Sequence, residues 1–513
     1  MLSADRRSCI IVAALWPCMA LGPAADILRA QTPAAPVATT RTLTLDEALS
    51  IAERTSERVA IAHAGVSRAD GGQQLARSER LPHLFGSASY DRTLKSEFEG
   101  LFDTGTTDPG TDPGSEVDFS NLPFGQANVY RLGLSFTQVL YSGGRIKAQE
   151  AQATIRRDSA GLNLNSAQAQ NTLDVAEAYY DAALTDWLVS ITEATYAQAD
   201  RSLQVTSEQR LAGRLSEFEL LRARVARDSL QPSVVRARNN REVAYLRLKQ
   251  LLDLPLDQPL ALTADLDGPA LSPPPRFAAS LADAESQTTS PIRLAVAQVG
   301  NEAKVADQAI AIARADRKPA ISFRSDYGLV DYPDSVPTFI DWRQNWTLGV
   351  AVSLPIVDGG RVKANEAIAR AGAEEARANL RLAQELDALD RASTRSDLTA
   401  ARAEWDASGS TIQQAQRAYE IAELRFSEGL STQLELSDAR LQLAQTQVTR
   451  AEAARNLQVR RIRFALLPAL PLVAASASAV QNASSTVSQT QTRTQTAPAA
   501  TGAAGAAGAS GGR

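Results

Sequence analysis

The chain is poor in the residues from which most catalytic and metal sites are built. Its 513 residues include only two cysteines, Cys9 and Cys18, and only two histidines, His63 and His83. The sequence contains no phosphate-binding glycine loop, no metal-ligand spacing and no nucleophile elbow. Hydrolytic, redox and metal-dependent reactions therefore lack their usual side chains, and the sequence predicts neither an enzyme nor a cofactor.

Aromatic residues are also scarce, at 5% of the chain, whereas Ala, Leu, Arg, Gln and Glu dominate its middle. This composition is typical of long paired helices rather than of a thick globular core. Beyond the first 30 residues there is no apolar run of about eighteen residues, the length that a membrane-spanning helix needs. A membrane-spanning chain of this kind would have to form a barrel. The net charge of −5, with both signs interspersed, predicts no nucleic-acid partner.

Residues 1–30 have the pattern of a secretory signal peptide. Arg6 and Arg7 precede an apolar run over residues 9–21, and small residues follow at 22–25. Both cysteines lie in this segment, so the processed chain would have no thiol, as suits an oxidising compartment. The alternative, an N-terminal membrane anchor, would need a longer apolar run.

Most of the stretch from residue 143 to residue 224 occurs twice. The strand-to-helix junctions are expected at two matching triplets, Gly143-Gly144-Arg145 and Gly359-Gly360-Arg361, which are 216 residues apart (359 minus 143). Each copy then continues without a proline to a lone glycine, Gly213 or Gly429. A helix over such an interval would be roughly 100 Å long. The constant offset predicts two internal repeats of one supersecondary unit.

These signals divide the chain into segments. They are a signal peptide over residues 1–30, a linker over 31–42, a first repeat over 43–252, a crossing segment over 253–280, a second repeat over 281–467 and a disordered low-complexity tail over 474–513. Thr44 and Glu47 have capping-box spacing and start a helix expected to reach about Arg80, with a counterpart from 281 to 318. The helical hairpins are expected over 144–252 and 360–467, and Pro232 predicts a kink or break in the first returning helix.

Period-two alternation predicts four strands, at about 83–92 and 129–140 in the first repeat and about 320–328 and 345–355 in the second. Each is about ten residues long, the length of a tilted transmembrane strand. Six apolar residues are expected to face lipid: Leu132, Leu134, Phe136, Leu348, Val350 and Val352. The aspartate-rich segment 103–118 between the first two strands is interpreted as a solvated outer loop, with a weak calcium site as the alternative.

Four strands are too few for one chain to close a barrel, which takes about eight. Open sheet edges are not tolerated in lipid, so the chain is expected to oligomerise. The predicted fold class is an α+β membrane protein: a homotrimer with a twelve-stranded β-barrel, four strands from each chain, that continues into a long periplasmic α-helical coiled-coil barrel.

Two strands, a long helix, a turn and a returning helix are predicted in this order twice along the chain. A chain with this arrangement resembles the TolC family of outer-membrane efflux proteins. The Gly-Gly-Arg junctions and the tip sequence 425–440 carry the resemblance, which covers about residues 44 to 467. It implies a trimeric exit duct of a tripartite efflux or type I secretion system, located in the outer membrane and extending into the periplasm. Its partners would be a periplasmic adaptor, an inner-membrane transporter and outer-membrane lipid. A periplasmic coiled-coil scaffold or adaptor without a barrel is the alternative.

The resemblance also implies roles for the hairpin tips. Adaptor contacts are expected at Gly213, Leu215, Ser216, Gly429, Leu430 and Ser431. Glu435 and Asp438, with Glu219 on the first hairpin, match the family's periplasmic gate carboxylates, and a solvated helix face is the alternative for them. In the best-known member a tyrosine and an arginine latch the tip, but Phe426 and Ser431 stand at those positions here and supply neither a phenol nor a guanidinium.

Overall fold

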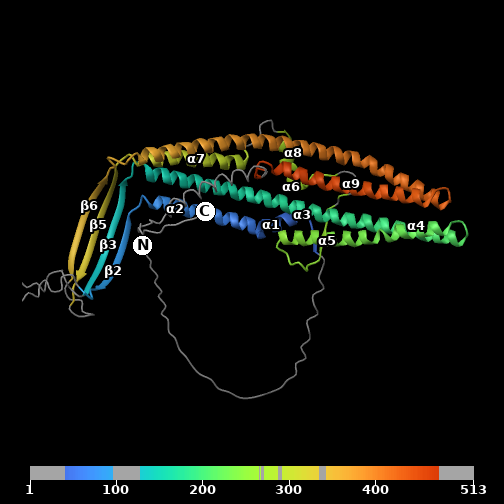
Figure 1. The fold of residues 1–513 in the computed structure, drawn as a ribbon, viewed down its shortest axis with the longest axis horizontal. Coiled ribbons are helices and arrows are strands. Elements are labelled where there is room, and N and C mark those ends of the chain that lie inside the picture. Colours follow the sequence, from blue (N-terminus) through green and yellow to red (C-terminus); the bar gives the residue numbers. More distant parts are fainter. Residues whose placement is uncertain are drawn as a thin grey trace, which may run out of the picture.

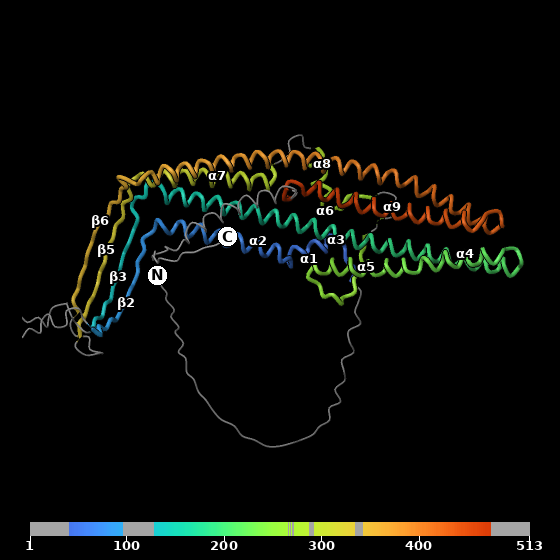
Figure 2. The backbone as a smooth tube through the Cα atoms, in the orientation of Figure 1, coloured from blue at the N-terminus to red at the C-terminus, as the bar shows by residue number. Residues whose placement is uncertain are grey.

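A computed structural model describes residues 41–95, 128–264, 266, 268, 271–286, 292–333 and 342–472. The expected signal peptide, most of the linker, the aspartate-rich segment and the low-complexity tail lie outside these residues. A four-stranded sheet stands at one end of the molecule, and the helices run away from it as a long bundle (Figure 1). Both hairpin tips lie at the end of the bundle that is far from the sheet (Figure 2).

The sheet is antiparallel and joins the two halves of the chain. Its strands are β2 (His83–Arg92), β3 (Asn128–Tyr141), β5 (Ala320–Asp331) and β6 (Arg343–Ser353), in the order β2-β3-β5-β6. The two strands of the first half lie where the alternation predicts them. β5 continues to Asp331 rather than ending near 328, and β6 ends before Pro355, which has no N–H to donate to a ladder. β2 and β6 form the two edges.

Two helices of 67 residues each dominate the bundle, α3 (Arg145–Leu211) and α8 (Arg361–Ser427). The first returning segment consists of α4 (Glu217–Asp228) and α5 (Gln231–Leu251), and Pro232 stands in the first turn of α5, so the break that this proline predicts is present. The second returning helix, α9 (Gln433–Leu466), is continuous.

The helix expected from Thr44 to about Arg80 is two helices, α1 (Leu45–Thr55) and α2 (Glu57–Ser78), so the prediction of one helix was wrong. The capping box of Thr44 and Glu47 is confirmed. Ser56 breaks the helix because its backbone is extended and its hydroxyl caps α2. That hydroxyl also donates to Oδ1 of Asn171 over 2.9 Å in a buried position, so α3 stabilises the break.

The counterpart in the second half was also predicted as one helix, over 281–318, and is α6 (Pro275–Ser286) and α7 (Leu294–Ala315). Arg293, with an extended backbone, precedes α7 and is 1% exposed. Its guanidinium donates to Asp390 over 2.6 Å and to the carbonyl oxygens of Leu470 (2.9 Å) and Pro471 (2.6 Å). This buried charge holds the start of α7 against α8 and the chain that follows α9.

The core lies midway along the bundle, where the crossing segment passes. There β4 (Leu260–Leu262) pairs in parallel with β1 (Arg41–Leu43), so residues 41 and 42, predicted as linker, belong to a strand. The hydroxyl of Tyr179 on α3 donates to the carbonyl oxygen of Leu43 over 3.1 Å, which ties β1 to the bundle. None of the described helices has both the length and the apolar character to cross a membrane.

Each long helix starts at a pair of glycines in the left-handed region. The φ angles are 67° and 96° at Gly143 and Gly144, and 63° and 86° at Gly359 and Gly360. Other residues rarely adopt this conformation, so the glycine pair allows the chain to turn sharply into the helix. At Gly143 the chain is also crowded, because a Cβ there would lie 2.6 Å from the carbonyl oxygen of Ala315.

Each long helix is capped by the side chain of the residue directly before its glycine pair. The carboxylate of Asp358 accepts from the backbone N–H of Val362 over 2.9 Å and of Gly360 over 3.0 Å. These donors lower the pKa of Asp358. In the first half the hydroxyl of Ser142 accepts from Ile146 N–H over 3.3 Å.

Replacement of Gly143 by Ala should destabilise the protein more than the same change at Gly359. Both residues have nearly the same positive φ, which costs an alanine about 1–2 kcal/mol. Only at Gly143 would the new methyl group meet the carbonyl oxygen of Ala315, and such overpacking costs about 1–3 kcal/mol more. Thermal unfolding of the purified protein, followed by circular dichroism, measures the difference. Equal transition temperatures for the two variants would contradict the close approach.

Candidate functional site

The two hairpin tips share one turn geometry. Gly213 and Gly429 have φ angles of 73° and 75° and end α3 and α8. In the second tip the N–H of Leu430 donates to Arg425 O over 2.8 Å and that of Gly429 to Phe426 O over 3.0 Å, the paired bonds of a Schellman motif. The same two bonds occur at the first tip. The lone glycines in the sequence therefore predicted the turns at the correct residues.

The N-cap residues of the returning helices lie three residues after these glycines. The hydroxyls of Ser216 and Thr432 accept from the backbone N–H of Glu219 and Glu435, each over 3.4 Å. This cap places one glutamate in the first turn of each returning helix, where the helix dipole stabilises a carboxylate. Among the predicted tip residues, Leu430 is 70% exposed, whereas Leu215 and Ser431 are half-buried.

The expected gate carboxylates lie at these helix starts. Glu435 and Asp438 are both exposed and occupy one face of α9, whereas Leu436 between them is 3% exposed. Neither carboxylate forms an ion pair with any described residue. Glu219 is placed on α4, at the matching position of the other hairpin, and is half-buried. Its Oε2 atom is inaccessible to solvent and has no hydrogen-bond partner among the described residues.

Hydrogen bonds between distant residues hold the two tips together, and sequence reasoning missed them. Gln433, 2% exposed, accepts a hydrogen bond from the hydroxyl of Ser202 on α3 over 3.0 Å. The side-chain amide of Gln209 on α3 donates to the carbonyl oxygen of Ser427 over 3.3 Å. These residues are more than 200 positions apart in the chain, so no local signal could have paired them.

A small cluster fills the inside of the second hairpin. It contains Ala415, Tyr419, Phe426, Leu436 and Leu443. Phe426 is therefore part of the packing at the tip. Tyr419 donates to Glu423 over 3.1 Å, and burial, then Glu423, raises its pKa to about 12. Arg440, 5% exposed, also lies in this hairpin, and burial lowers its pKa.

The sheet has one apolar and one polar face. Residues directly opposite each other in a ladder share a face. Leu134 lies opposite Tyr327, which lies opposite Trp346, and Phe136 lies opposite Ser325, which lies opposite Leu348. The register thus puts all six predicted residues, Leu132, Leu134, Phe136, Leu348, Val350 and Val352, on the same face.

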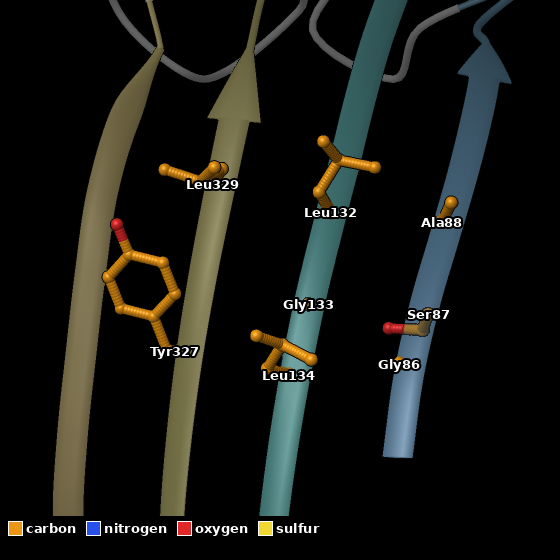
Figure 3. Close-up of a pocket in the computed structure, with 8 residues that line it drawn as sticks. All are labelled: Gly86, Ser87, Ala88, Leu132, Gly133, Leu134, Tyr327 and Leu329. Carbon is orange, nitrogen blue, oxygen red and sulfur yellow. The ribbon is translucent and has the colours of Figure 1, made fainter. Parts of the chain in front are cut away.

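This apolar face is uncovered in the single chain. Leu348, Val350 and Val352 are each more than 60% exposed. A shallow apolar hollow in it is lined by Gly86, Ala88, Leu132, Leu134, Tyr327 and Leu329, together with Ser87 and Gly133 (Figure 3). On the opposite face Ser135 donates to Asp326 over 2.7 Å, and Arg131 pairs with Asp91.

Within the described residues, no group of His, Cys, Asp and Glu side chains is arranged to hold a metal ion.

A sequence model of outer membrane efflux proteins matches residues 48–253 and 293–469. Nodulation protein T of Rhizobium leguminosarum bv. viciae is 24% identical over 346 residues, 66% of this chain and 68% of that protein. The toluene efflux pump outer membrane protein TtgI of Pseudomonas putida is 28% identical over 299 residues, and the match spans 57% of this chain and 56% of TtgI.

The fold is similar to that of the Campylobacter jejuni CmeC outer membrane channel, with a TM-score of 0.66, 16% identity, and coverage of 85% of this chain and 88% of that one. The family match covers most of the chain, in two segments that each contain two strands of the sheet and one long helix. The chain therefore belongs to the outer membrane efflux protein family, whose members are transport proteins of the outer membrane rather than enzymes.

Proposed function

We propose that three copies of this chain form one continuous duct that spans the outer membrane and extends into the periplasm. The duct serves a tripartite efflux or type I secretion system and receives its substrate from an inner-membrane transporter through a periplasmic adaptor. The observation that carries the proposal is the sheet with one bare apolar face, joined through glycine turns to two helices of 67 residues.

The edges of the sheet support closure by other copies. β2 and β6 each have a neighbour on one side only within the described residues. All neighbours in the sheet are antiparallel, so β6 of one copy can pair with β2 of the next and keep the same alternation. Three copies give a twelve-stranded barrel with the apolar face toward lipid and the polar face toward the lumen.

The helices supply the periplasmic part of the duct. A helix of 67 residues is roughly 100 Å long, far more than a membrane requires. In this arrangement both hairpin tips point away from the barrel, and the exposed tip residues contact the adaptor.

The carboxylates supply a gate. Three copies would bring six carboxylates from Glu435 and Asp438 around one mouth. Because neither has a cationic partner among the described residues, their charge acts on passing ions: it attracts cations and repels anions.

The sheet orientation predicts unequal effects of arginine on the two faces of β6. Val350→Arg would place a charge on the lipid side, at a cost of about 2–4 kcal/mol near the midplane. Ala351→Arg, one residue along, would point into the aqueous lumen and should be far milder. The measurement is the fraction of protein that assembles in the outer membrane. Equal defects in both variants would refute the orientation.

The edge strands predict that the protein is trimeric in detergent. A single sheet with two open edges has no stable barrel, so dissociation should remove the strand signal. Light scattering gives the mass, and circular dichroism gives the strand content. A compact monomer that keeps its strand signal would contradict the proposal.

The gate predicts a change in ion selectivity in planar bilayers. The double variant Glu435→Ala and Asp438→Ala should lose cation preference, and a polyvalent cation should block it about tenfold more weakly, which corresponds to about 1.4 kcal/mol. Glu374→Ala with Glu375→Ala, which removes two exposed carboxylates from α8 far from the tip, is the matched control. If the tip variant behaves like this control, Glu435 and Asp438 are an ordinary solvated helix face.

A further inference from the structure

Four helix ends meet the sheet at one end of the molecule (Figure 1). They are the C-terminal ends of α2 and α7 and the N-terminal ends of α3 and α8. We define the collar as the segments 77–82, 141–150, 314–319 and 354–370, which contain these ends. Its basic residues are Arg77, Arg80, Arg145, Lys147, Arg314, Arg317, Lys318, Arg361, Lys363 and Arg370, and all of them are exposed.

The collar is basic in a chain that is acidic overall. Its ten basic and five acidic residues give a net charge of +5 (10 minus 5), whereas the whole chain carries −5. The rest of the chain therefore carries −10. In a trimer the three collars would lie at the same height along the duct and carry about three times the charge of one. Salt screens the field of these charges over about one Debye length, roughly 10 Å at moderate salt.

The acidic residues of the collar do not neutralise it. Glu366 accepts from Arg314 over 2.8 Å and from Arg370 over 2.7 Å. Glu150 lies 3.5 Å from Arg77 and 3.7 Å from Arg80. Each of these two carboxylates is thus shared between at least two arginines, so positive charge remains.

The collar lysines are free of ion pairs. Lys147, Lys318 and Lys363 make none with any described residue. They are three of the six lysines in the whole chain. Their ammonium groups are available to an outside anion.

An apolar rim lies where the collar meets the sheet. Ile356 and Val357 are each 90% exposed. Leu140 and Tyr141, which are 216 positions earlier (356 minus 140), are 57% and 44% exposed. Leu140 and Tyr141 end β3, an inner strand, so strand pairing by a neighbouring copy would not cover them.

We propose that the collar binds the phosphate groups of anionic phospholipids in the membrane leaflet next to the helices, while the rim contacts the adjoining acyl chains. The inference rests on the proposed function, because it requires that the sheet spans the membrane. Basic side chains just outside a spanning segment attract anionic headgroups, and their alkyl stems lie along apolar surface. The sheet and the apolar rim would lie at the depth of the acyl chains, and the basic collar would lie at the depth of the headgroups.

Spin-labelled lipids in vesicles that contain the full chain test this proposal. Electron paramagnetic resonance separates label held at the protein surface from label in bulk lipid. Phosphatidylglycerol should associate at least about fivefold more strongly than phosphatidylcholine, which corresponds to about 1 kcal/mol. In 1 M salt, where the Debye length falls to about 3 Å, the preference should disappear.

The decisive variant combines Lys147→Gln, Lys318→Gln and Lys363→Gln, and its preference should fall below about twofold. Its control combines Arg224→Gln, Arg236→Gln and Arg247→Gln, which removes the same charge from exposed positions on α4 and α5 and should keep the preference. A wild type without preference, or a lysine variant that retains it, overturns the proposal. A complete absence of surface-held label would instead refute the membrane-spanning sheet itself.

Discussion

The conversion of strand into helix at two glycine pairs is the constraint on which the rest of the structure depends. Two successive residues with positive φ turn the chain into α3 three residues after β3 ends, and into α8 after a segment of seven residues that follows β6. The backbone geometry of these two residues therefore helps to set the direction in which each long helix begins. At Gly143 the carbonyl oxygen of Ala315, the last residue of α7, also leaves no room for a side chain. Helices of this length amplify small angular errors at their base, so a rigid start decides where the tips lie.

Features with a local cause were predictable from the sequence. Alternation located β2 and β3, lone glycines located both tips, and Pro232 marked the break between α4 and α5. Features that depend on distant partners were not. The sequence around Ser56 is compatible with one continuous helix. Its hydrogen-bond partner Asn171 is 115 positions further along the chain, so the break could not be seen from the local sequence. The sequence alone gives no sign that Arg293 is buried, but its guanidinium donates to two separate segments, α8 and the chain that follows α9.

The same division applies to the functional surfaces. Helical spacing alone puts Glu435 and Asp438 on one face, and alternation alone puts Leu348 and Val350 on one side of the sheet. The contact between Gln433 and Ser202 needs the tertiary fold, because α9 there meets α3 as well as its hairpin partner α8. The collar is also invisible in a linear scan: its charges come from four short segments that only the sheet brings to one level.

The two hairpins of the chain differ mechanically, although their outgoing helices are equal in length. The first returns through α4 and α5, with an interruption at Ser229 and Leu230, and the second returns through the continuous α9. A rod with a joint bends under less force than an unbroken rod of the same material. In a threefold assembly, jointed and stiff hairpins would alternate around the axis. If such a ring widened, the three jointed hairpins would bend more than the three stiff ones. Its mouth would therefore open with threefold rather than sixfold symmetry.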